Sequence, residues 1–387
     1  MMDQGDYSHA LTEEQKAIRQ TARAFAEKEM RPVVMQYDES QEFPFEIVRR
    51  LGELGFMGMT WPVELGGSGL SDVEAVLIIE ELARVDPSVA LTVASHNSLC
   101  SGHIMLFGNA AQQQRFIPQL ASGRALGAWG LTEPGSGSDS GGMQTTARRD
   151  GKDWVMNGSK AFITQGSVGS TYVIMAVTDP SQPKKSISAF LLEKGMPGFT
   201  IGKKENKLGM RCSDTATLLF DNVRIPQENL IGEIGEGFKQ ALRVLDGGRI
   251  GIAALSVGIA QGALDASLAY AKERKQFGKA IGEFEAIQWK LADMATDITA
   301  ARLMTWQAAL LKMGGKPFSM EASQAKYFAS EIASRAASEA VQIHGGYGFI
   351  KEFPVEKLYR DVKLMTIGEG TSEVQKMVIA RNLLTQG

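Results

Sequence analysis

The stretch T-T-A-R-R-D-G-K-D-W-V-M-N-G, from Thr145 to Gly158, decides the fold class. Its Asp-Gly and Asn-Gly dipeptides follow short β-forming segments, and such dipeptides are the strongest short-range signals of a β-hairpin. Further β-branched or aromatic segments, each ended by Gly, Pro, Asp or Asn, lie at 171–177, 187–192, 199–203 and 215–220. Because no helical pattern separates these segments, they predict a compact antiparallel, barrel-like β domain and not a doubly wound parallel sheet.

Helical patterns flank the β region on both sides. Towards the N-terminus, Thr12 and Gln15 form a capping-box start, and apolar residues recur at helical spacing as far as about residue 120. Towards the C-terminus, long segments that are apolar nearly all round are typical of an up-and-down bundle, and they lie at 238–271, 284–312 and 321–342. We therefore expect an α+β chain, which consists of an N-terminal helical domain (1–125), a central antiparallel β-barrel-like domain (126–236) and a C-terminal four-helix bundle (237–387).

The composition argues against several classes of protein. A hydrophobic fraction of 44% with 22% charged residues is ordinary for a soluble globular chain of 387 residues. The net charge is −3 and the basic residues form no long run, so nucleic-acid binding is not expected. Two cysteines, no signal peptide and no apolar run of roughly 18 to 20 residues predict a cytoplasmic protein without membrane insertion. We interpret His96 and His103, which lack a third ligand, as core or interface histidines and expect no metal site.

One carboxylate near the C-terminus is a candidate general base. This is Glu369 in I-G-E-G-T-S-E-V-Q, residues 367–375, where the flanking glycines let the backbone approach a ligand closely. The alternative is that the segment only starts a helix, with Thr371 or Ser372 as N-cap and Glu373 in the first turn. Both interpretations can hold, because a cap also positions the loop that carries the acid.

Other segments have the composition of ligand-binding loops. The loop W-G-L-T-E-P-G-S-G-S-D (129–139) exposes N–H groups and hydroxyls that suit a polar heterocycle or phosphate, although it lacks the third glycine of a dinucleotide fingerprint. The basic segment 270–278 can bind an anion. Simpler interpretations are a surface turn for the loop, a buried strand at 160–166, a solvated charge run at 270–278, and a structural His344 at a helix end.

The order and spacing of these segments resemble the acyl-CoA dehydrogenases, in their short- and branched-chain branch, over essentially the whole chain. The motifs that carry the resemblance are L-T-E-P-G-S-G-S-D, F-I-T-Q-G, L-D-G-G-R-I-G-I-A, R-K-Q-F-G-K, Q-I-H-G-G-Y-G-F and E-G-T-S-E-V-Q. The resemblance implies a FAD-dependent oxidoreductase that converts an acyl-CoA to the 2-enoyl-CoA. It also implies an electron-transfer flavoprotein as electron acceptor, and a homotetramer.

The resemblance assigns residues to each expected ligand. Positions that match FAD contacts within the chain are Trp129, Leu131, Thr132, Gly137, Ser138, Phe162, Ile163 and Thr164. Positions that match groups reaching a neighbouring subunit's FAD are Arg274, Phe277 and Gln288, with Gln342, Ile343, Gly345, Gly346, Thr371 and Glu373 completing that site. Positions that match the substrate site are Ser138, Asp246, Arg249, Gly368 and Gly370.

The same resemblance implies how the reaction proceeds. Glu369 takes the α-proton of the thioester while N5 of the flavin accepts a hydride from the β-carbon, and the N–H of Glu369 and a ribityl hydroxyl donate to the thioester carbonyl. An apolar pocket should raise the pKa of this glutamate towards the operating pH. Some relatives carry the base on the L-D-G-G-R helix, but the matching position here is Gly248, which leaves Glu369 as the candidate.

Two departures from the family pattern bear on the ligands. Phe162 stands where many relatives have tryptophan, so stacking on the flavin should be altered but retained. Gly368 stands where many have tyrosine, which should widen the acyl pocket and favour an acyl group that is branched at Cα or alicyclic, such as cyclohexanecarboxyl. The alternatives are a butyryl-CoA or short-chain acyl-CoA dehydrogenase, an acyl-CoA oxidase and, from another class, a non-catalytic flavoprotein that serves as a binding module.

Overall fold

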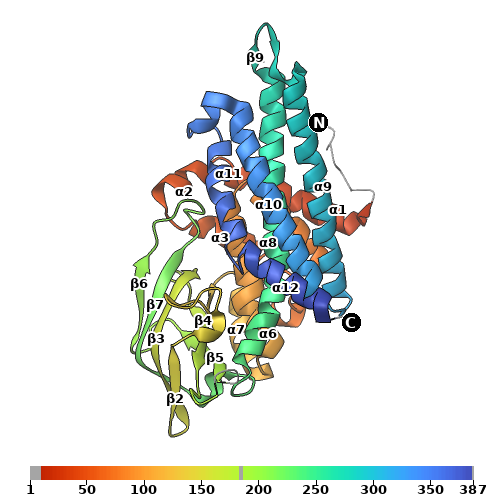
Figure 1. Cartoon of the computed structure of the whole chain (residues 1–387). Coiled ribbons are helices and arrows are strands. Elements are labelled where there is room, and N and C mark those ends of the chain that lie inside the picture. The colour runs from red at the N-terminus through yellow and green to blue at the C-terminus, as the bar shows by residue number, and fades with distance from the viewer. Residues whose placement is uncertain (1–9, 183–185, 386–387) are drawn as a thin grey trace.

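The N-terminal part of the molecule is helical (Figure 1). In this computed structural model the described residues are 10–182 and 186–385. The helices are α1 (Glu13–Phe25), α2 (Val34–Ser40), α3 (Phe45–Glu53), α4 (Asp72–Ala83), α5 (Pro87–Ser95), α6 (Ser101–Phe107) and α7 (Ala110–Ala121). A π-helical turn, His96–Cys100, joins α5 to α6, so the two make one long buried helix. The predicted capping box of α1 is confirmed, since Thr12 Oγ1 accepts from the N–H of Gln15 at 3.2 Å.

The central part of the chain forms one sheet. Its strands are β1 (Gly127–Gly130), β2 (Thr146–Asp150), β3 (Asp153–Thr164), β4 (Thr171–Val177), β5 (Ile187–Glu193), β6 (Phe199–Lys204), β7 (Thr215–Ile225) and β8 (Leu230–Ile231). They are ordered β6-β7-β3-β2-β4-β5-β8, with β1 paired to β4. Most pairs are antiparallel, as predicted, while β1 and β2 each run parallel to β4.

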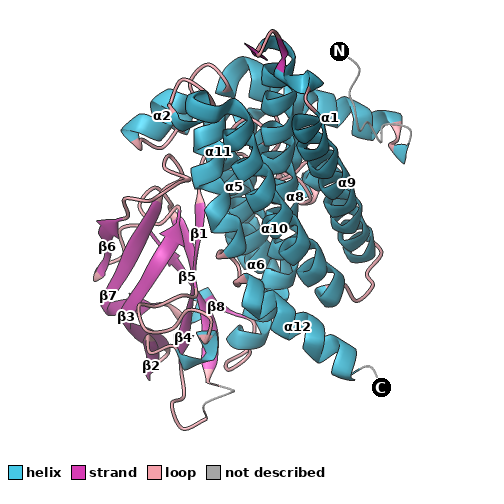
Figure 2. Ribbon diagram, turned by 45° about the horizontal axis from the view of Figure 1, so that its top comes forward, coloured by secondary structure: helices cyan, strands magenta, loops and turns pink. Residues whose placement is uncertain are grey.

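The sheet curls around its own core, which makes it barrel-like. Alternate residues of β4 face two cores: Tyr172 belongs to the core enclosed by the strands, and Val173 to the core shared with α6 and α7. The ring of Tyr172 contacts the ring of Phe199 on β6, with centroids 4.7 Å apart, although three strands separate β4 from β6 in the sheet. The outer face of the sheet lies against the helices (Figure 2).

Of the two predicted hairpin signals, only the first is a turn. Asp150 pairs with Asp153 across Gly151, so the Asp-Gly dipeptide closes the β2–β3 hairpin. The Asn157–Gly158 dipeptide instead lies inside β3, at a register shift against β7, so the prediction of a turn there was wrong. Tertiary pairing explains the difference, because Gly158 leaves room for Thr145: a Cβ there would lie 2.6 Å from Thr145 Oγ1.

The C-terminal part is the predicted helical bundle. Its helices are α8 (Gly237–Glu273), α9 (Glu285–Met313), α10 (Ser319–His344), α11 (Val355–Asp361) and α12 (Ser372–Thr385), and the short strands β9 (Lys275–Gln276) and β10 (Lys279–Ala280) form a hairpin after α8. Helices α8, α9 and α10 run side by side, and α12 packs on α10 at the end of the bundle opposite to β9 (Figure 1).

Helix α8 is unusually apolar. By length and composition it is the one helix of the described chain that could span a membrane. The sequence did not predict this, because polar residues interrupt its apolar runs. However, 72% of its apolar window is buried within the protein, where α8 packs against α4, α9 and α10. The core of the bundle therefore accounts for this composition.

Candidate functional site

Glu369 lies in a tight turn immediately before α12. Its φ of 54° and the φ of 96° at Gly370 are left-handed, so the turn depends on glycine at one position and strains the acidic residue at the other. Thr371 Oγ1 accepts from the N–H of Val374 at 3.4 Å, so Thr371 caps the helix. The predicted helix start and the candidate base therefore coexist.

One oxygen of the Glu369 carboxylate is enclosed by protein, while the residue as a whole is half-buried. Its Oε2 is buried and has no hydrogen-bond partner among the described residues. It lies on Gly248 of α8, where an added Cβ would stand only 2.0 Å from Oε2. Desolvation raises the pKa of Glu369 to about 7, although the charges of Lys326 and Arg249 act in the opposite direction. A carboxylate with these properties is suited to take up a proton near neutral pH.

The predicted substrate residues of α8 lie beside this carboxylate. Arg249 Nη1 donates to Asp246 Oδ1 at 2.5 Å and to Ser323 Oγ at 3.3 Å, and its Nε is buried without a partner in the described chain. Ser319 Oγ also donates to Asp246 at 2.9 Å. Desolvation lowers the pKa of Arg249, while Asp246 and Glu369 oppose this change. The structure therefore brings Glu369, Asp246 and Arg249 together.

The predicted cofactor residues of the β domain come from two adjacent segments. The N–H of Ala161 donates to the carbonyl of Thr132 at 2.9 Å, which holds the segment 129–132 against the end of β3. Phe162 has a left-handed φ of 57° and is 66% exposed, while its neighbour Ile163 is buried. The bulged end of β3 thus presents an aromatic ring at the surface of the β domain.

The ring of Trp129 points into the core shared with α6. Its Nε1 donates to His103 Nδ1 at 3.1 Å, and His103 Nε2 bonds to Gln240 Oε1 at 3.0 Å. Because Nδ1 accepts, the proton of the neutral ring is on Nε2 and donates to Gln240. Burial lowers the pKa of His103 to about 4, which keeps the ring neutral and confirms it as a core histidine.

A buried ion pair that the sequence analysis missed pins the loop 129–139. Lys160 Nζ donates to Glu133 Oε1 at 2.7 Å and to the carbonyl of Leu131 at 3.0 Å, and both charged side chains are buried. The other two predicted cofactor residues of this loop, Gly137 and Ser138, are exposed. An available signal was the lysine directly before the apolar residues 161–163 of the strand, because a buried lysine needs a partner.

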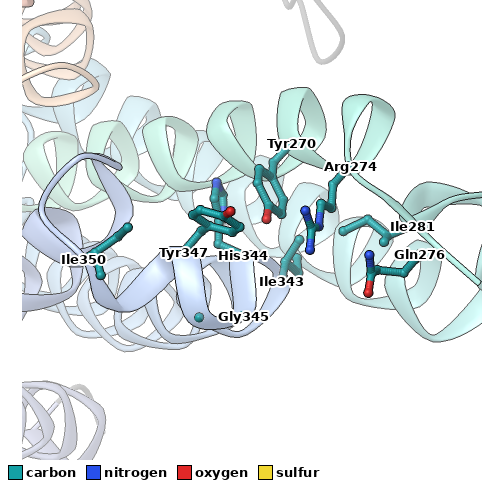
Figure 3. Close-up of a pocket in the computed structure, with 10 residues that line it drawn as sticks. Tyr270, Arg274, Gln276, Ile281, Ile343, His344, Gly345, Tyr347 and Ile350 are labelled. Atoms are coloured by element: carbon teal, nitrogen blue, oxygen red, sulfur yellow. The ribbon is translucent and has the colours of Figure 1, made fainter.

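A second set of predicted cofactor residues lies at the other end of the bundle. An open pocket of about 440 Å³ is lined by Tyr270, Arg274, Gln276, Ile281, Ile343, His344, Gly345, Gly346, Tyr347 and Ile350 (Figure 3). Phe277 in the adjacent hairpin is 94% exposed, and Gln288 Nε2 donates to the carbonyl of Gly282 at 3.0 Å. His344 stacks on Tyr270 with ring centroids 4.2 Å apart, so it supports the wall of the pocket.

The two sets are far apart within one chain. Along α8, 25 residues separate Gly248 from Glu273, which at 1.5 Å per residue is roughly 38 Å. In Figure 1, β9 lies at one end of the bundle and α12 at the other. Thr371 and Glu373 follow Glu369 directly in the chain and therefore lie at its end of the bundle. Arg274 and Gln342, which were predicted to share a site with them, lie at the opposite end.

No cluster of three His, Cys, Asp or Glu side chains within residues 10–182 and 186–385 is placed to hold a metal ion. Both Cys100 and Cys212 are buried free thiols.

Comparisons with known proteins cover nearly the whole chain. Family models match the acyl-CoA dehydrogenase N-terminal domain at residues 12–124, the middle domain at 128–223 and the C-terminal domain at 235–384. A short-chain specific acyl-CoA dehydrogenase of Clostridium acetobutylicum is 46% identical over 96% of this chain and 98% of its own. The structure of butyryl-CoA dehydrogenase from Megasphaera elsdenii matches with a TM-score of 0.95 and 45% identity, covering 97% of this chain and 99% of its own. A structure described as the electron transferring flavoprotein of Acidaminococcus fermentans matches with a TM-score of 0.96 and 47% identity, covering the same shares.

Proposed function

The chain belongs to the acyl-CoA dehydrogenase family, and on that premise we propose that Glu369 is the base that removes the α-proton of a short-chain acyl-CoA. As a member of this family the protein is an oxidoreductase that acts on acyl-CoA thioesters and uses FAD. The observation that carries the proposal is the enclosed, unpaired Oε2 of Glu369, whose pKa of about 7 makes it a competent acceptor of a proton at neutral pH.

The residues at the site fit a flavin. A ring exposed on a left-handed bulge, Phe162, offers a flat apolar surface for a heterocycle. Side chains added at Gly135 or Gly137 would meet nothing within 4 Å, so the backbone of that loop is open to a ligand. We propose that Leu131, Thr132, Gly137, Ser138 and the segment Phe162–Thr164 hold the flavin, with Trp129 supporting the loop from behind. When bound, FAD supplies the acceptor for the hydride that leaves the β-carbon.

The turn at Glu369 can also stabilise the enolate-like charge that develops on the thioester carbonyl. Within the described chain its backbone N–H donates to no protein acceptor, whereas its carbonyl accepts from Gln375 Nε2 at 3.1 Å. We propose that this N–H donates to the thioester oxygen. A single preorganised donor of this kind contributes roughly 3 to 4 kcal/mol to the transition state. Base and donor then come from one residue, and Asp246 and Arg249 line the approach of the CoA.

The acyl group that we propose is straight and short, such as butyryl. The expected wide pocket for an alicyclic group rested on Gly368, yet a Cβ added at Gly368 would face Leu364 at 3.5–3.6 Å. That direction gives no sign of space for a ring beside the reacting carbons. The short-chain specific enzyme of Clostridium acetobutylicum and the butyryl-CoA dehydrogenase of Megasphaera elsdenii, at 46% and 45% identity, support a short straight acyl group over an alicyclic one.

The separation of the two cofactor sets supports an assembly in which each flavin site is shared. Because roughly 38 Å of α8 lies between them, we propose that Arg274, Phe277, Gln288 and the segment 342–346 contact the FAD of a neighbouring subunit in a homotetramer. We further propose that the enzyme is cytoplasmic and passes its electrons to an electron-transfer flavoprotein.

The experiment that tests the proposal is anaerobic stopped-flow bleaching of the flavin by acyl-CoA. We expect Glu369→Gln to slow bleaching by roughly 10²–10⁴-fold, the usual contribution of a general base, while the bound flavin is retained. In the wild type, butyryl-CoA should bleach the flavin faster than isobutyryl-CoA or cyclohexanecarboxyl-CoA. Normal bleaching in the variant would place the base elsewhere, and a preference for the ring would restore the alicyclic substrate.

A further inference from the structure

Lys326 on α10 is a buried cation that the mechanism above does not use. Its side chain is fully buried, and it is surrounded along the helix by the buried small residues Ala322, Ala325 and Ala329. A lysine in such an environment is costly unless its charge has a role, because burial disfavours the ammonium form. Burial accordingly lowers the pKa of Lys326 to about 8, although the charge of Glu369 opposes this shift.

The ammonium group is directed at the turn that carries the base. Lys326 Nζ donates to the carbonyl of Gly370 at 2.7 Å. The same carbonyl accepts from Gln375 Nε2 at 2.9 Å, and Gln375 also donates to the carbonyl of Glu369 at 3.1 Å. Two side chains from different helices thus fix the two peptide carbonyls whose residues have left-handed φ angles.

The charged groups around the base come from three helices. Lys326 and Glu331 lie on α10, Arg249 and Asp246 on α8, and Glu373 on α12. Of these, Lys326 is the largest influence that favours the ionised form of Glu369, followed by Arg249. Arg249 is already engaged with Asp246, whose negative charge offsets part of its effect.

The indirect contact with the base is consistent with catalysis. A direct ion pair would hold the carboxylate away from substrate and make it a weak base. Here the ammonium bonds to the neighbouring carbonyl, and Glu369 Oε2 has no partner in the described chain. The positive charge therefore favours the ionised form of the carboxylate, whose Oε2 is still available to accept a proton.

We infer that Lys326 is a positioning residue for proton abstraction, which locks the left-handed turn at Glu369 and Gly370 and keeps the Glu369 carboxylate ionised in its desolvated site. This inference rests on the proposed role of Glu369 as the base. It assigns to α10 a task in the reaction that is separate from its packing role in the bundle.

The test is a titration of Glu369 itself in the substrate-free holoenzyme. Infrared spectroscopy follows the carboxylic-acid band from about pH 5 to about pH 10, a range that includes the pKa of Glu369, about 7, and that of Lys326, about 8. The band is assigned by subtracting the spectrum of Glu369→Gln. Loss of the nearby positive charge in Lys326→Met should raise the apparent pKa of Glu369 by about one unit or more. Lys326→Gln, which keeps a donor for the Gly370 carbonyl, should shift it in the same direction, and Lys326→Arg should restore the wild-type titration.

The pH profile of flavin bleaching gives a second readout. If the pKa rises by about one unit from 7, Lys326→Met should bleach about fivefold more slowly at pH 7 and recover at pH 9, since the ionised fraction of the base falls by that factor. The matched control is Lys376→Met, which removes an exposed lysine near the same turn and should leave both readouts unchanged.

An unmoved Glu369 titration in both folded, flavin-bound variants Lys326→Met and Lys326→Gln would overturn the inference. So would a slowing of bleaching that is equal at every pH, which would reduce Lys326 to a purely structural residue. These outcomes differ from a failure of the proposed function, which would appear as normal bleaching in Glu369→Gln.

Discussion

Gly248 is the residue that most tightly limits where the base can stand. From the sequence it was interpreted only as an empty alternative-base position. In the structure it is the floor of the carboxylate site, because any Cβ there would lie 2.0 Å from Oε2 and 2.9 Å from Cδ of Glu369. A glycine at this position therefore cannot act as the alternative base, and its lack of a side chain leaves space for the carboxylate of Glu369.

Gly248→Ala should displace the carboxylate and slow flavin bleaching by roughly 10²-fold, the order of loss that follows a misplacement of about 1 Å. Folding should not suffer, since alanine is favoured over glycine in a helix by roughly 0.8–1.0 kcal/mol. Stopped-flow kinetics and thermal unfolding measure the two effects separately.

The matched control for this change is Gly251→Ala, on the same helix. Its Cβ would make ordinary contacts with Ala94 at 3.7 Å and Ile79 at 3.8 Å, so bleaching should stay near the wild-type rate. Equal rates in the two variants would show that the carboxylate does not need the space above Gly248.

At the scale of the element, the end of β3 is built to present a ring. Its register against β7 shifts between Lys160 and Ile163, and the residue in the bulge, Phe162, has a left-handed φ. A bulky side chain is uncommon in this region, so the strain points to a function for the exposed ring. Lys160, at the start of the bulge, is buried and paired with Glu133, which anchors the strand end from inside.

Phe162→Leu should weaken FAD binding by about 2- to 10-fold, because an aromatic contact contributes roughly 0.5–1.5 kcal/mol beyond its buried area. Unfolding of the apoprotein should change little, since the ring is 66% exposed. The measurement is retention of flavin during dialysis against increasing chaotrope. Phe45→Leu, a change at a 60% exposed ring on α3, is the control, and equal retention in both variants would exclude Phe162 from the cofactor site.

At the scale of the whole molecule, one buried ion network ties the three regions together. Lys357 Nζ of α11 donates to Asp86 Oδ1 at 2.9 Å, just before α5, and to Asp361 Oδ2 at 2.5 Å. Asp361 also accepts from the N–H of Met210, in the loop between β6 and β7, at 2.5 Å. The two carboxylates and the ammonium are almost fully buried, so the network sets how the β domain sits against the helices.

Lys357→Met should destabilise the protein by about 3–5 kcal/mol, because it leaves two carboxylates buried without their cation. Burial already raises the pKa of Asp361, and loss of its ammonium partner should raise that pKa further. Because this carboxyl is then protonated at a higher pH than in the unfolded chain, the deficit should be largest at neutral pH and shrink as the pH falls. Thermal unfolding of the variant and the wild type, compared from about pH 5 to about pH 8, measures this trend.

Lys351→Met is the matched control for that prediction. Lys351 pairs with Glu39 and so also joins the C-terminal region to the N-terminal one, but the two side chains are 63% and 65% exposed. Solvent screens such a pair, so its loss should have little effect on stability at any pH. A similarly small cost for Lys357→Met would mean that the buried network does not hold the regions together.

The sequence by itself was enough for the features that depend on local pattern. The capping box at Thr12, the Asp150–Gly151 turn, the bundle helices and the identity of Glu369 as the base candidate all follow from residue order within short windows. The domain limits at residues 125 and 236 remain predictions. The motifs also indicated the family, because their order along the chain is itself a property of the sequence.

Only the tertiary structure decided the features that depend on approach between distant segments. Lys326 reaches Gly370 across 44 positions, and Gly248 of α8 meets Glu369 in the turn before α12. Asn157–Gly158 becomes part of a strand because β7 pairs with it. The physical reason is that periodicity and turn chemistry act through neighbouring residues, whereas burial, desolvation and the pKa of a carboxylate depend on what the folded chain places around it.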